Sequence, residues 1–266
     1  MARARAALRR VGNLWFLALL LVAWELYARN ASTLFFPPFG EVFAEFRRSW
    51  IGEPSGLFLS DEFWHHGTAS LTRFAKGWIP AAVGGIVVGV LLGRVPLLAR
   101  MFNPVIRFSM AVPKAVFLPV ALGLFGITDM ANQFLIFIST VWIILVNTMD
   151  GVAAVDRAWL RSARSLRIGR IAFLGRVVLP AASPQILAGL RVSIGIGLIV
   201  MVVSELYATT AGLGYQILVY QRTFQYVQMW SSFVLIGLIG ITVNGLFSLA
   251  EHRLLHWQRR PGLAEA

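Results

Sequence analysis

The sequence predicts an all-α polytopic membrane protein with six transmembrane helices. Of its 266 residues, 58% are hydrophobic and only 14% are charged, whereas a soluble protein keeps about 25% charged residues to cover its surface. The apolar residues fall into long runs of the length that a membrane span needs, about 20 residues. The basic residues gather between these runs. These observations exclude an ordinary soluble enzyme and leave room for one membrane domain.

The first apolar run, Leu14 to Tyr27, follows Arg3, Arg5, Arg9 and Arg10. It resembles a signal peptide, but no small-residue cleavage site follows, so we interpret it as a retained first span. Residues 29–67 are polar and predict an external loop. An amphipathic piece from Val42 to Trp50 predicts an interfacial helix inside that loop.

The second span is predicted at 68–93. Gly85, Gly89 and Gly93 repeat every fourth residue, a pattern that lets another helix approach closely and that we interpret as packing. A turn at 94–100 leads to a third segment at 104–125, which contains Pro113 and Pro119. Prolines inside a span free backbone carbonyls that other helices or water must satisfy, so this segment is expected to kink beside a cavity.

The remaining spans are predicted at 130–152, 184–206 and 229–249. The stretch between the fourth and fifth spans is not apolar enough to cross a membrane, and it carries six arginines at 157, 161, 164, 167, 170 and 176. Most basic residues fall on one side if both termini are cytoplasmic, which is the orientation that the positive-inside rule favours. The net charge of +12 therefore indicates orientation and not nucleic-acid binding.

This basic loop, 156–180, is expected to form two short amphipathic helices joined by a turn near Ile168 and Gly169. Helices of this kind outside the membrane could dock a partner protein or lie on anionic lipid. The residues alone leave both readings open.

The loop resembles the EAA loop of binding-protein-dependent ABC importer permeases. The family pattern has Glu-Ala-Ala, then three residues, a turn glycine, and a stretch that ends in Leu-Pro. The positions that match it are Ala163, Leu166, Val178, Leu179 and Pro180. The chain departs from the pattern at Arg161, Ser162 and Arg167, which stand where the family has Glu, the first Ala and the turn glycine, and Gly169 follows two residues later.

Further segments resemble the nitrate, sulfonate and taurine-type branch of that family, so the resemblance extends over nearly the whole chain. In chain order they are Phe36 to Val42, Ser70 to Gly77, Val112 to Pro119, Ser204 to Ala208, and Gly212 to Ile217.

The resemblance implies a type I (MetI-like) permease core with cytoplasmic coupling helices, working as a transport subunit without catalytic residues or a cofactor of its own. A second permease copy, in a homodimer, would complete the pathway. Two cytoplasmic ABC ATPases would bind ATP and Mg, and an external binding protein would deliver the solute. The only lysines, Lys76 and Lys114, do not stand in a phosphate-binding P-loop pattern, which agrees with this division of labour.

The resemblance also gives a division of the chain and a location in the plasma membrane or bacterial inner membrane. Residues 1–67 would hold the basic tail, first span and external loop. Residues 68–250 would form the transmembrane core with its coupling loop at 156–180, and residues 251–266 a cytoplasmic tail.

The candidate site residues fall into three groups. The ATPase-coupling loop would use Ala163, Leu166, Gly169, Phe173, Leu179 and Pro180. Polar residues inside spans are expensive and invite a functional hypothesis, and the translocation-pathway candidates are Pro113, Lys114, Pro119, Thr140, Asn147 and Glu205. The external gate candidates are Gly212, Gly214 and Tyr215.

Each pathway candidate also has a structural interpretation. Lys114 could meet an anionic solute or snorkel to the interface. Glu205 could help to form an outer gate or pair with Arg222. Asn147 and Asn244 are typical of hydrogen bonds between helices.

Two groups of histidines do not predict a metal site. His65 and His66 are adjacent in a loop beside Glu62 and lack a third ligand, and His252 and His256 lie among basic residues that suit lipid headgroups. The alternative to an ABC permease is an ion-coupled secondary transporter, but that class shows internal repeats and central acidic residues, whereas this sequence shows no repeat and its Asp150 lies at the end of a span. The solute is expected to be a small anion, because of Lys114 and the excess of arginine.

Overall fold

The computed structural model describes residues 2–31, 33–51 and 59–256, with the backbone alone described for 2–14 and for Arg164. Apart from one β-bridge between Ile51 and Leu59, the regular structure of these residues is helical. In chain order the helices are α1 (Ala2–Ala31), α2 (Phe39–Trp50), the π-helical turn η1 (Phe63–Gly67), α3 (Thr68–Arg94), α4 (Pro96–Ala111), the 3₁₀ turn η2 (Lys114–Val116), α5 (Phe117–Phe125), α6 (Asp129–Ala153), α7 (Arg157–Ser165), α8 (Arg170–Phe173), the π-helical turn η3 (Leu174–Val178), α9 (Leu179–Glu205), α10 (Leu213–Arg222) and α11 (Tyr226–Leu254).

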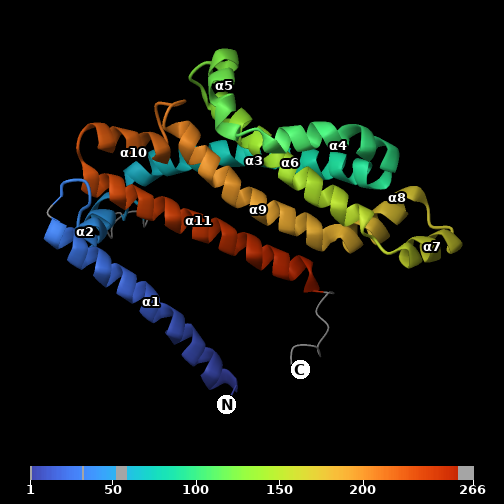
Figure 1. The fold of residues 1–266 in the computed structure, drawn as a ribbon, viewed down its shortest axis with the longest axis horizontal. Helices are drawn as coiled ribbons and strands as arrows, with labels where there is room; N and C mark the ends of the chain where they lie inside the picture. Colours follow the sequence, from blue (N-terminus) through green and yellow to red (C-terminus); the bar gives the residue numbers. More distant parts are fainter. Residues whose placement is uncertain (1, 32, 52–58, 257–266) are drawn as a thin grey trace.

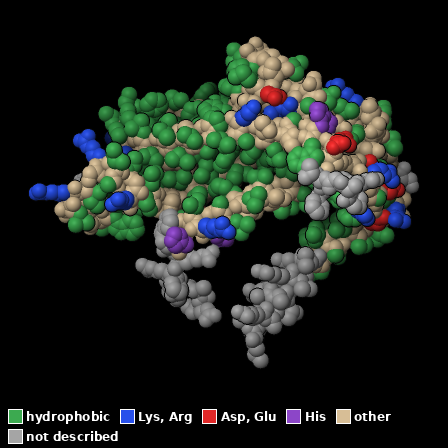
Figure 2. Space-filling view, turned by 180° about the vertical axis from the view of Figure 1, so that it is seen from behind, with side chains coloured by type: hydrophobic (Ala, Val, Ile, Leu, Met, Phe, Trp, Pro, Cys, Tyr) green, Lys and Arg blue, Asp and Glu red, His purple; other side chains and the backbone are tan. Residues whose placement is uncertain are grey.

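The long helices form a bundle with α6 at its centre, packed between α3 and α9 (Figure 1). Helices α2 and α10 lie at one end, called here the α10 end, and α7 and α8 lie at the other, called the α7 end. Helix α1 diverges from the bundle and approaches it only near α2. Figure 2 shows a broad apolar face between the two charged ends, as expected of a surface that meets lipid tails.

Small residues let α3 and α6 pack closely. A Cβ at Gly89 would lie 2.6 Å from the Cβ of Thr148 and 2.7 Å from the carbonyl oxygen of Leu145. Gly85 and Gly93 face α6 in the same way, and the earlier Gly77 joins them. The packing role predicted for the glycine repeat is therefore confirmed.

Four helical stretches are long and apolar enough to cross a membrane, at 63–94, 129–153, 170–205 and 226–254. A fifth arises if α4 and the segment Lys114–Phe125 together form one broken span. Helix α1 contains the predicted first span but is not among these stretches. The described residues therefore support a multi-pass all-α membrane protein and do not confirm six spans.

The third segment differs from its prediction at both ends. The expected turn at 94–100 is wrong, because α4 already begins at Pro96, a residue suited to the first turn of a helix. The chain breaks at Val112 and Pro113, and the two halves of the segment meet at an angle of 83°. Pro119 lies within the first turn of α5, where its missing N–H removes no helical hydrogen bond, so it does not break the helix.

Two predicted boundaries fall inside continuous helices. The boundary at 67/68 lies between η1 and α3, and the boundary at 250/251 lies inside α11, which continues to Leu254. The predicted tail beyond His256 lies outside the described residues. The predicted interfacial helix is present as α2, but its Val42 and Trp50 are fully buried, and the Trp50 indole donates a hydrogen bond to Ser231 Oγ of α11 (3.1 Å).

Candidate functional site

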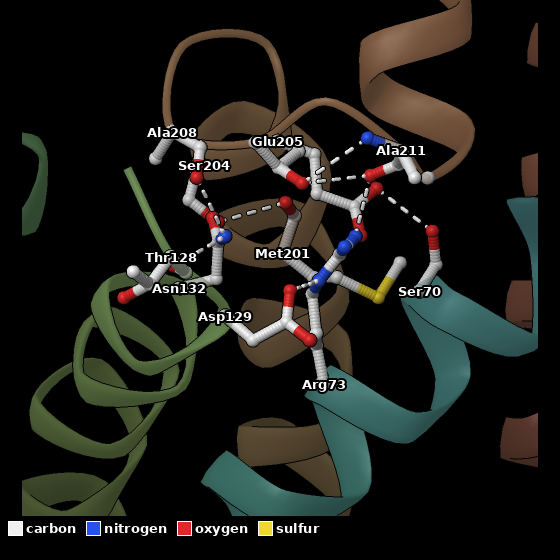
Figure 3. Close-up of polar contacts among 12 residues, drawn as sticks. Ser70, Arg73, Thr128, Asp129, Asn132, Met201, Ser204, Glu205, Ala208 and Ala211 are labelled. Atoms are coloured by element: carbon white, nitrogen blue, oxygen red, sulfur yellow. Dashed lines mark hydrogen bonds and ion pairs between the residues drawn. The ribbon is translucent and has the colours of Figure 1, made fainter. Parts of the chain in front are cut away.

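A buried polar cluster joins three long helices at the α10 end (Figure 3). Ser70 and Arg73 come from α3, Asp129 from α6 and Glu205 from α9. Arg73 Nη1 donates to Glu205 Oε1 (2.9 Å), Arg73 Nε donates to Asp129 Oδ1 (2.6 Å), and Ser70 Oγ donates to Glu205 Oε2 (2.8 Å). We call these four residues the Arg73 cluster.

The cluster also holds the backbone that leads into α10. Arg73 Nη1 donates to the carbonyl oxygen of Ala211 (2.6 Å), and the amide of Gly214 donates to Glu205 Oε2 (3.0 Å). The amide of Leu213 donates to Ser70 Oγ (2.9 Å). Because the first amides of a helix lack partners within it, these contacts satisfy the start of α10 and fix it to α3 and α9.

Two glycines make this close approach possible. Gly212 has φ +121°, and a Cβ there would lie 2.6 Å from Arg73 Nη1 and from the Glu205 carboxylate. A Cβ at Gly214 would lie 2.4 Å from the carbonyl oxygen of Val202. Of the three gate candidates these two thus adjoin Glu205, while Tyr215 is half-buried and makes none of the cluster's contacts.

The suggested pairing of Glu205 with Arg222 is wrong, because Glu205 pairs with Arg73. The two residues lie 132 positions apart, so no local pattern links them. Arg73 lies within the segment Ser70 to Gly77 that resembles the permease family, but it is not among the candidate site residues proposed from the sequence. The signal was available, because an arginine inside an apolar span needs a partner.

The kink in the third segment borders a cavity of about 260 Å³. Its lining comes from η2, α5, α6 and α9 and includes Lys114, Leu135 and Ser204. Lys114 is the only charged residue among the described lining residues, and its Nζ donates to the carbonyl oxygens of Ser109 and Val112 (3.1 Å for the latter). An ammonium has three donors, and no described residue accepts from the third. Pro113 precedes η2 at this site.

Thr140 and Asn147 lie where α6 meets α9. Thr140 is fully buried, and its hydroxyl donates to the Ile136 carbonyl of its own helix (2.8 Å). Asn147 lies against Gly189 and accepts a hydrogen bond from Gln185 of α9 (3.1 Å). The interhelical role considered for Asn147 is therefore present.

The basic loop at the α7 end contains the expected first helix and turn. After α7 ends at Ser165, Arg167 lies in the left-handed region (φ +48°), and the amide of Ile168 donates to the carbonyl of Ala163 (3.2 Å). This six-residue bond is the Schellman arrangement, which usually has glycine at the left-handed position. Arg167, which stands where the family pattern has its turn glycine, thus takes the backbone conformation of a glycine.

The second half of the loop is not a separate helix. Helix α8 continues through η3 into α9, so Leu179 and Pro180 lie inside one helical stretch from Arg170 to Glu205. Gly169 begins α8.

The candidate loop residues point in different directions. Ala163 is buried, and Phe173 and Leu179 pack against the core, with the guanidinium of Arg94 5.0 Å above the Phe173 ring. Leu166 and Ile171 are 74% and 90% exposed. Together with Trp159 of α7, which is 58% exposed, this pair gives the loop apolar side chains that a partner can reach.

The histidine and carboxylate groups make structural contacts. His66 Nδ1 accepts a hydrogen bond from the amide of Gly212 (3.1 Å), and Glu62 accepts from Gln216 (2.9 Å) and Tyr220. Burial and the Glu62 carboxylate raise the pKa of Tyr220, on α10 outside the spans, to about 12. Glu251 pairs with Arg191 of α9. In the part of the chain that the structure describes, no three His, Asp or Glu side chains converge in a metal-binding arrangement.

Comparison with known proteins gives one consistent result. Residues 85–259 match the family model described as "Binding-protein-dependent transport system inner membrane component". The chain is 34% identical to the taurine transport system permease protein of Escherichia coli (strain K12) over 76% of this chain and 73% of that protein. It is 32% identical to the bicarbonate transport system permease protein of Synechococcus elongatus over 90% of this chain and 84% of that protein. It is 31% identical to the nitrate import permease protein of Leptolyngbya laminosa over 73% and 69%.

The fold resembles that of a chain in inward-facing crystal forms of the MetNI methionine ABC transporter. The TM-score is 0.61 at 16% identity, and the match covers 75% of this chain and 95% of that chain. This likeness shows the type I importer permease fold.

Proposed function

The chain belongs to the family of binding-protein-dependent transport system inner membrane components, and from that premise we propose that it forms half of an import pathway for a small anionic solute. The family consists of ABC permease subunits, which lack an ATPase site and bind no cofactor. ATP is bound by the partner ATPase, and an external binding protein delivers the solute. The chain is accordingly a multi-pass protein of the inner membrane.

The anionic class is supported by Lys114. The three solutes that name the relatives above, taurine, nitrate and bicarbonate, each carry an oxyanion group. In this chain Lys114 brings a positive charge, with one donor left over, to the wall of an otherwise uncharged cavity beside the broken span. Lys114 is half-buried, and a cation that is partly removed from water attracts an anion more strongly than one at the surface.

The test is uptake by the whole transporter in liposomes, with its ATPase and binding protein. Candidate solutes are first screened for binding to the binding protein that co-purifies with the chain. Lys114→Gln should then lower the maximal rate of uptake at saturating loaded binding protein, whereas Lys114→Arg, which keeps the charge, should retain most of it. Equal rates for the two variants, or a solute without an anionic group, would contradict the proposal.

The basic loop supports a docking role for α7 and the turn after it. Leu166 and Ile171 expose apolar side chains next to Gly169 and Arg167, at the end of the bundle opposite α10. Burying such groups against a protein removes apolar surface from water. We propose that this surface docks on the ATPase and that the α7 end is cytoplasmic.

The remaining organisation follows from the same proposal. Helix α1 and the broken segment α4–α5 each cross the membrane, which with the four long stretches makes six spans and places both termini in the cytoplasm. Residues 1–67, 68–250 and 251–266 then form the peripheral first span, the transport core and the tail. A second copy of the chain would cover exposed apolar side chains such as Phe108 and Leu124.

A further inference from the structure

Arg73 forms ion pairs with two carboxylates, Glu205 and Asp129, and the two pairs differ in how easily they can be broken. Glu205 is fully buried and accepts hydrogen bonds from Ser70 and from the amide of Gly214 as well as from Arg73. The side chain of Asp129 is 61% exposed, and within the described residues Arg73 Nε is its only partner. Losing Glu205 would leave the buried guanidinium without its buried counter-charge, whereas the exposed carboxylate of Asp129 can turn into water.

One edge of the guanidinium has a donor without a partner among the described residues. Arginine presents five N–H donors in a planar fork, which suits the two oxygens of a carboxylate or similar oxyanion. Nη1 is occupied by Glu205 and by the carbonyl of Ala211. On the opposite edge Nε meets a single oxygen of Asp129, and Nη2 donates to no described residue.

We propose that the Nε–Nη2 edge of Arg73 is an anion-binding site, at which the oxyanion group of the solute replaces Asp129. A nitrate, carboxylate or sulfonate group supplies two oxygens where Asp129 supplies one. The exchange admits one negative charge and releases another, so the charge beside Glu205 does not change. The inference rests on the proposed anionic solute and assigns it a contact that precedes Lys114.

The position of the cluster fits a stage before the Lys114 cavity. The cluster lies at the α10 end, next to the loop between α9 and α10. Ser204, which lines the Lys114 cavity, is the neighbour of Glu205 in α9. The Arg73 cluster and the Lys114 cavity are therefore built on consecutive residues of α9.

The absence of cysteine from the sequence permits a direct test. In the whole transporter purified in detergent, Asp129→Cys provides the only thiol of this chain, and its labelling by the neutral reagent N-ethylmaleimide is followed on this chain by mass spectrometry. Nitrate or methanesulfonate replaces chloride at constant ionic strength. At ten times its Kd the anion should slow labelling about tenfold, because mass action leaves about a tenth of the sites open. Asp61→Cys, at an exposed position that pairs with no arginine among the described residues, should label equally in all salts.

A second variant shows whether Arg73 causes the protection. Adding Arg73→Gln and Glu205→Gln to Asp129→Cys removes both buried charges together, and the protection of the thiol at position 129 should disappear. If that variant does not assemble, Arg73→Lys is used instead, since lysine keeps the charge but has no two-point edge, and protection should weaken.

The failures of the two proposals can be told apart. Uptake of an anionic solute with no protection of the thiol in Asp129→Cys would overturn the inference and leave the proposed function intact. Protection with uptake of an uncharged solute would overturn the solute class, and with it the solute's place on Arg73. Protection by solute-free binding protein alone would identify a docking contact and would also contradict the inference.

Discussion

Arg73 and Glu205 show how strongly a single buried ion pair depends on both partners. Glu205→Ala would leave the buried guanidinium with only the exposed carboxylate of Asp129 as a counter-charge and should destabilise the chain by up to about 3–5 kcal/mol. Arg73→Met with Glu205→Leu removes both charges and should cost much less. Unfolding in mixed micelles measures both free energies. A double variant as unstable as the single one would show that packing, and not charge, dominates at this site.

Arg167 shows strain at one residue of the basic loop. A left-handed backbone costs a non-glycine residue about 1–2 kcal/mol, so Arg167→Gly should stabilise the turn by a similar amount. Gly169 has φ −61° and open space around it, so Gly169→Ala should leave the turn unchanged. Hydrogen exchange of the Ile168 amide reports on both. Faster exchange in Arg167→Gly would contradict the interpretation.

At this scale the sequence predicted residue types better than partners. Glu205 is a candidate because a carboxylate in a span is expensive, but the partner considered for it from the sequence is the nearby Arg222, as an alternative to an outer gate. Arg73, Asp129 and the amide of Gly214 converge only because three helices meet. Such convergence depends on packing over more than 100 residues of chain, which leaves no periodic signal.

The contact between α3 and α6 is the element pair most sensitive to size. Gly89→Ala places a Cβ within 2.7 Å of both Thr148 and the Leu145 carbonyl and should destabilise the bundle by about 1–3 kcal/mol, as overpacking does. Gly84 on the same helix has nothing within 4 Å of its Cβ position, so Gly84→Ala should be tolerated. Thermal denaturation in detergent compares the two. An equal loss in both variants would show that contact with α6 is not its cause, because alanine favours a helix more than glycine does.

Helix α7 and its turn should act as one docking element. Leu166→Asp places a charge on an exposed apolar position and should abolish co-purification of the ATPase while leaving the chain in the membrane, because an unpaired charge is costly in an interface. Ser165→Asp makes the same change at the neighbouring exposed polar position and should keep most of the binding. Normal ATPase binding by Leu166→Asp would disprove this docking surface.

Hydropathy placed the four long spans, because each is a long apolar run. It misplaced the start of α4 and the coupling loop's second half. Pro96 looked like a turn residue but also suits a helix start, and 170–178 is polar enough to look separate although it continues into α9. Charge content distinguishes segments that lie in lipid from segments that lie in water. It does not show whether a helix continues unbroken after it leaves the membrane.

The whole molecule should cross the membrane with the α7 end inside. Asp61→Cys should then react with a membrane-impermeant maleimide in intact cells, or in spheroplasts if an outer barrier blocks the reagent, whereas Ser165→Cys should react only after the membrane is opened. The chain has no other cysteine, so each label reports one position. Labelling of Ser165→Cys from outside would reverse the proposed orientation.

The 83° bend between α4 and α5 has a consequence for the life of the protein in the cell. Helix α4 has 16 residues and reaches only about 24 Å at about 1.5 Å per residue, less than the hydrocarbon core of about 30 Å. The non-helical backbone at Val112 and Pro113 is tolerated at membrane depth only beside protein or water. A newly made copy without partners exposes this break to lipid, so its survival against membrane proteases, and hence its abundance, should follow the supply of the subunits with which it assembles.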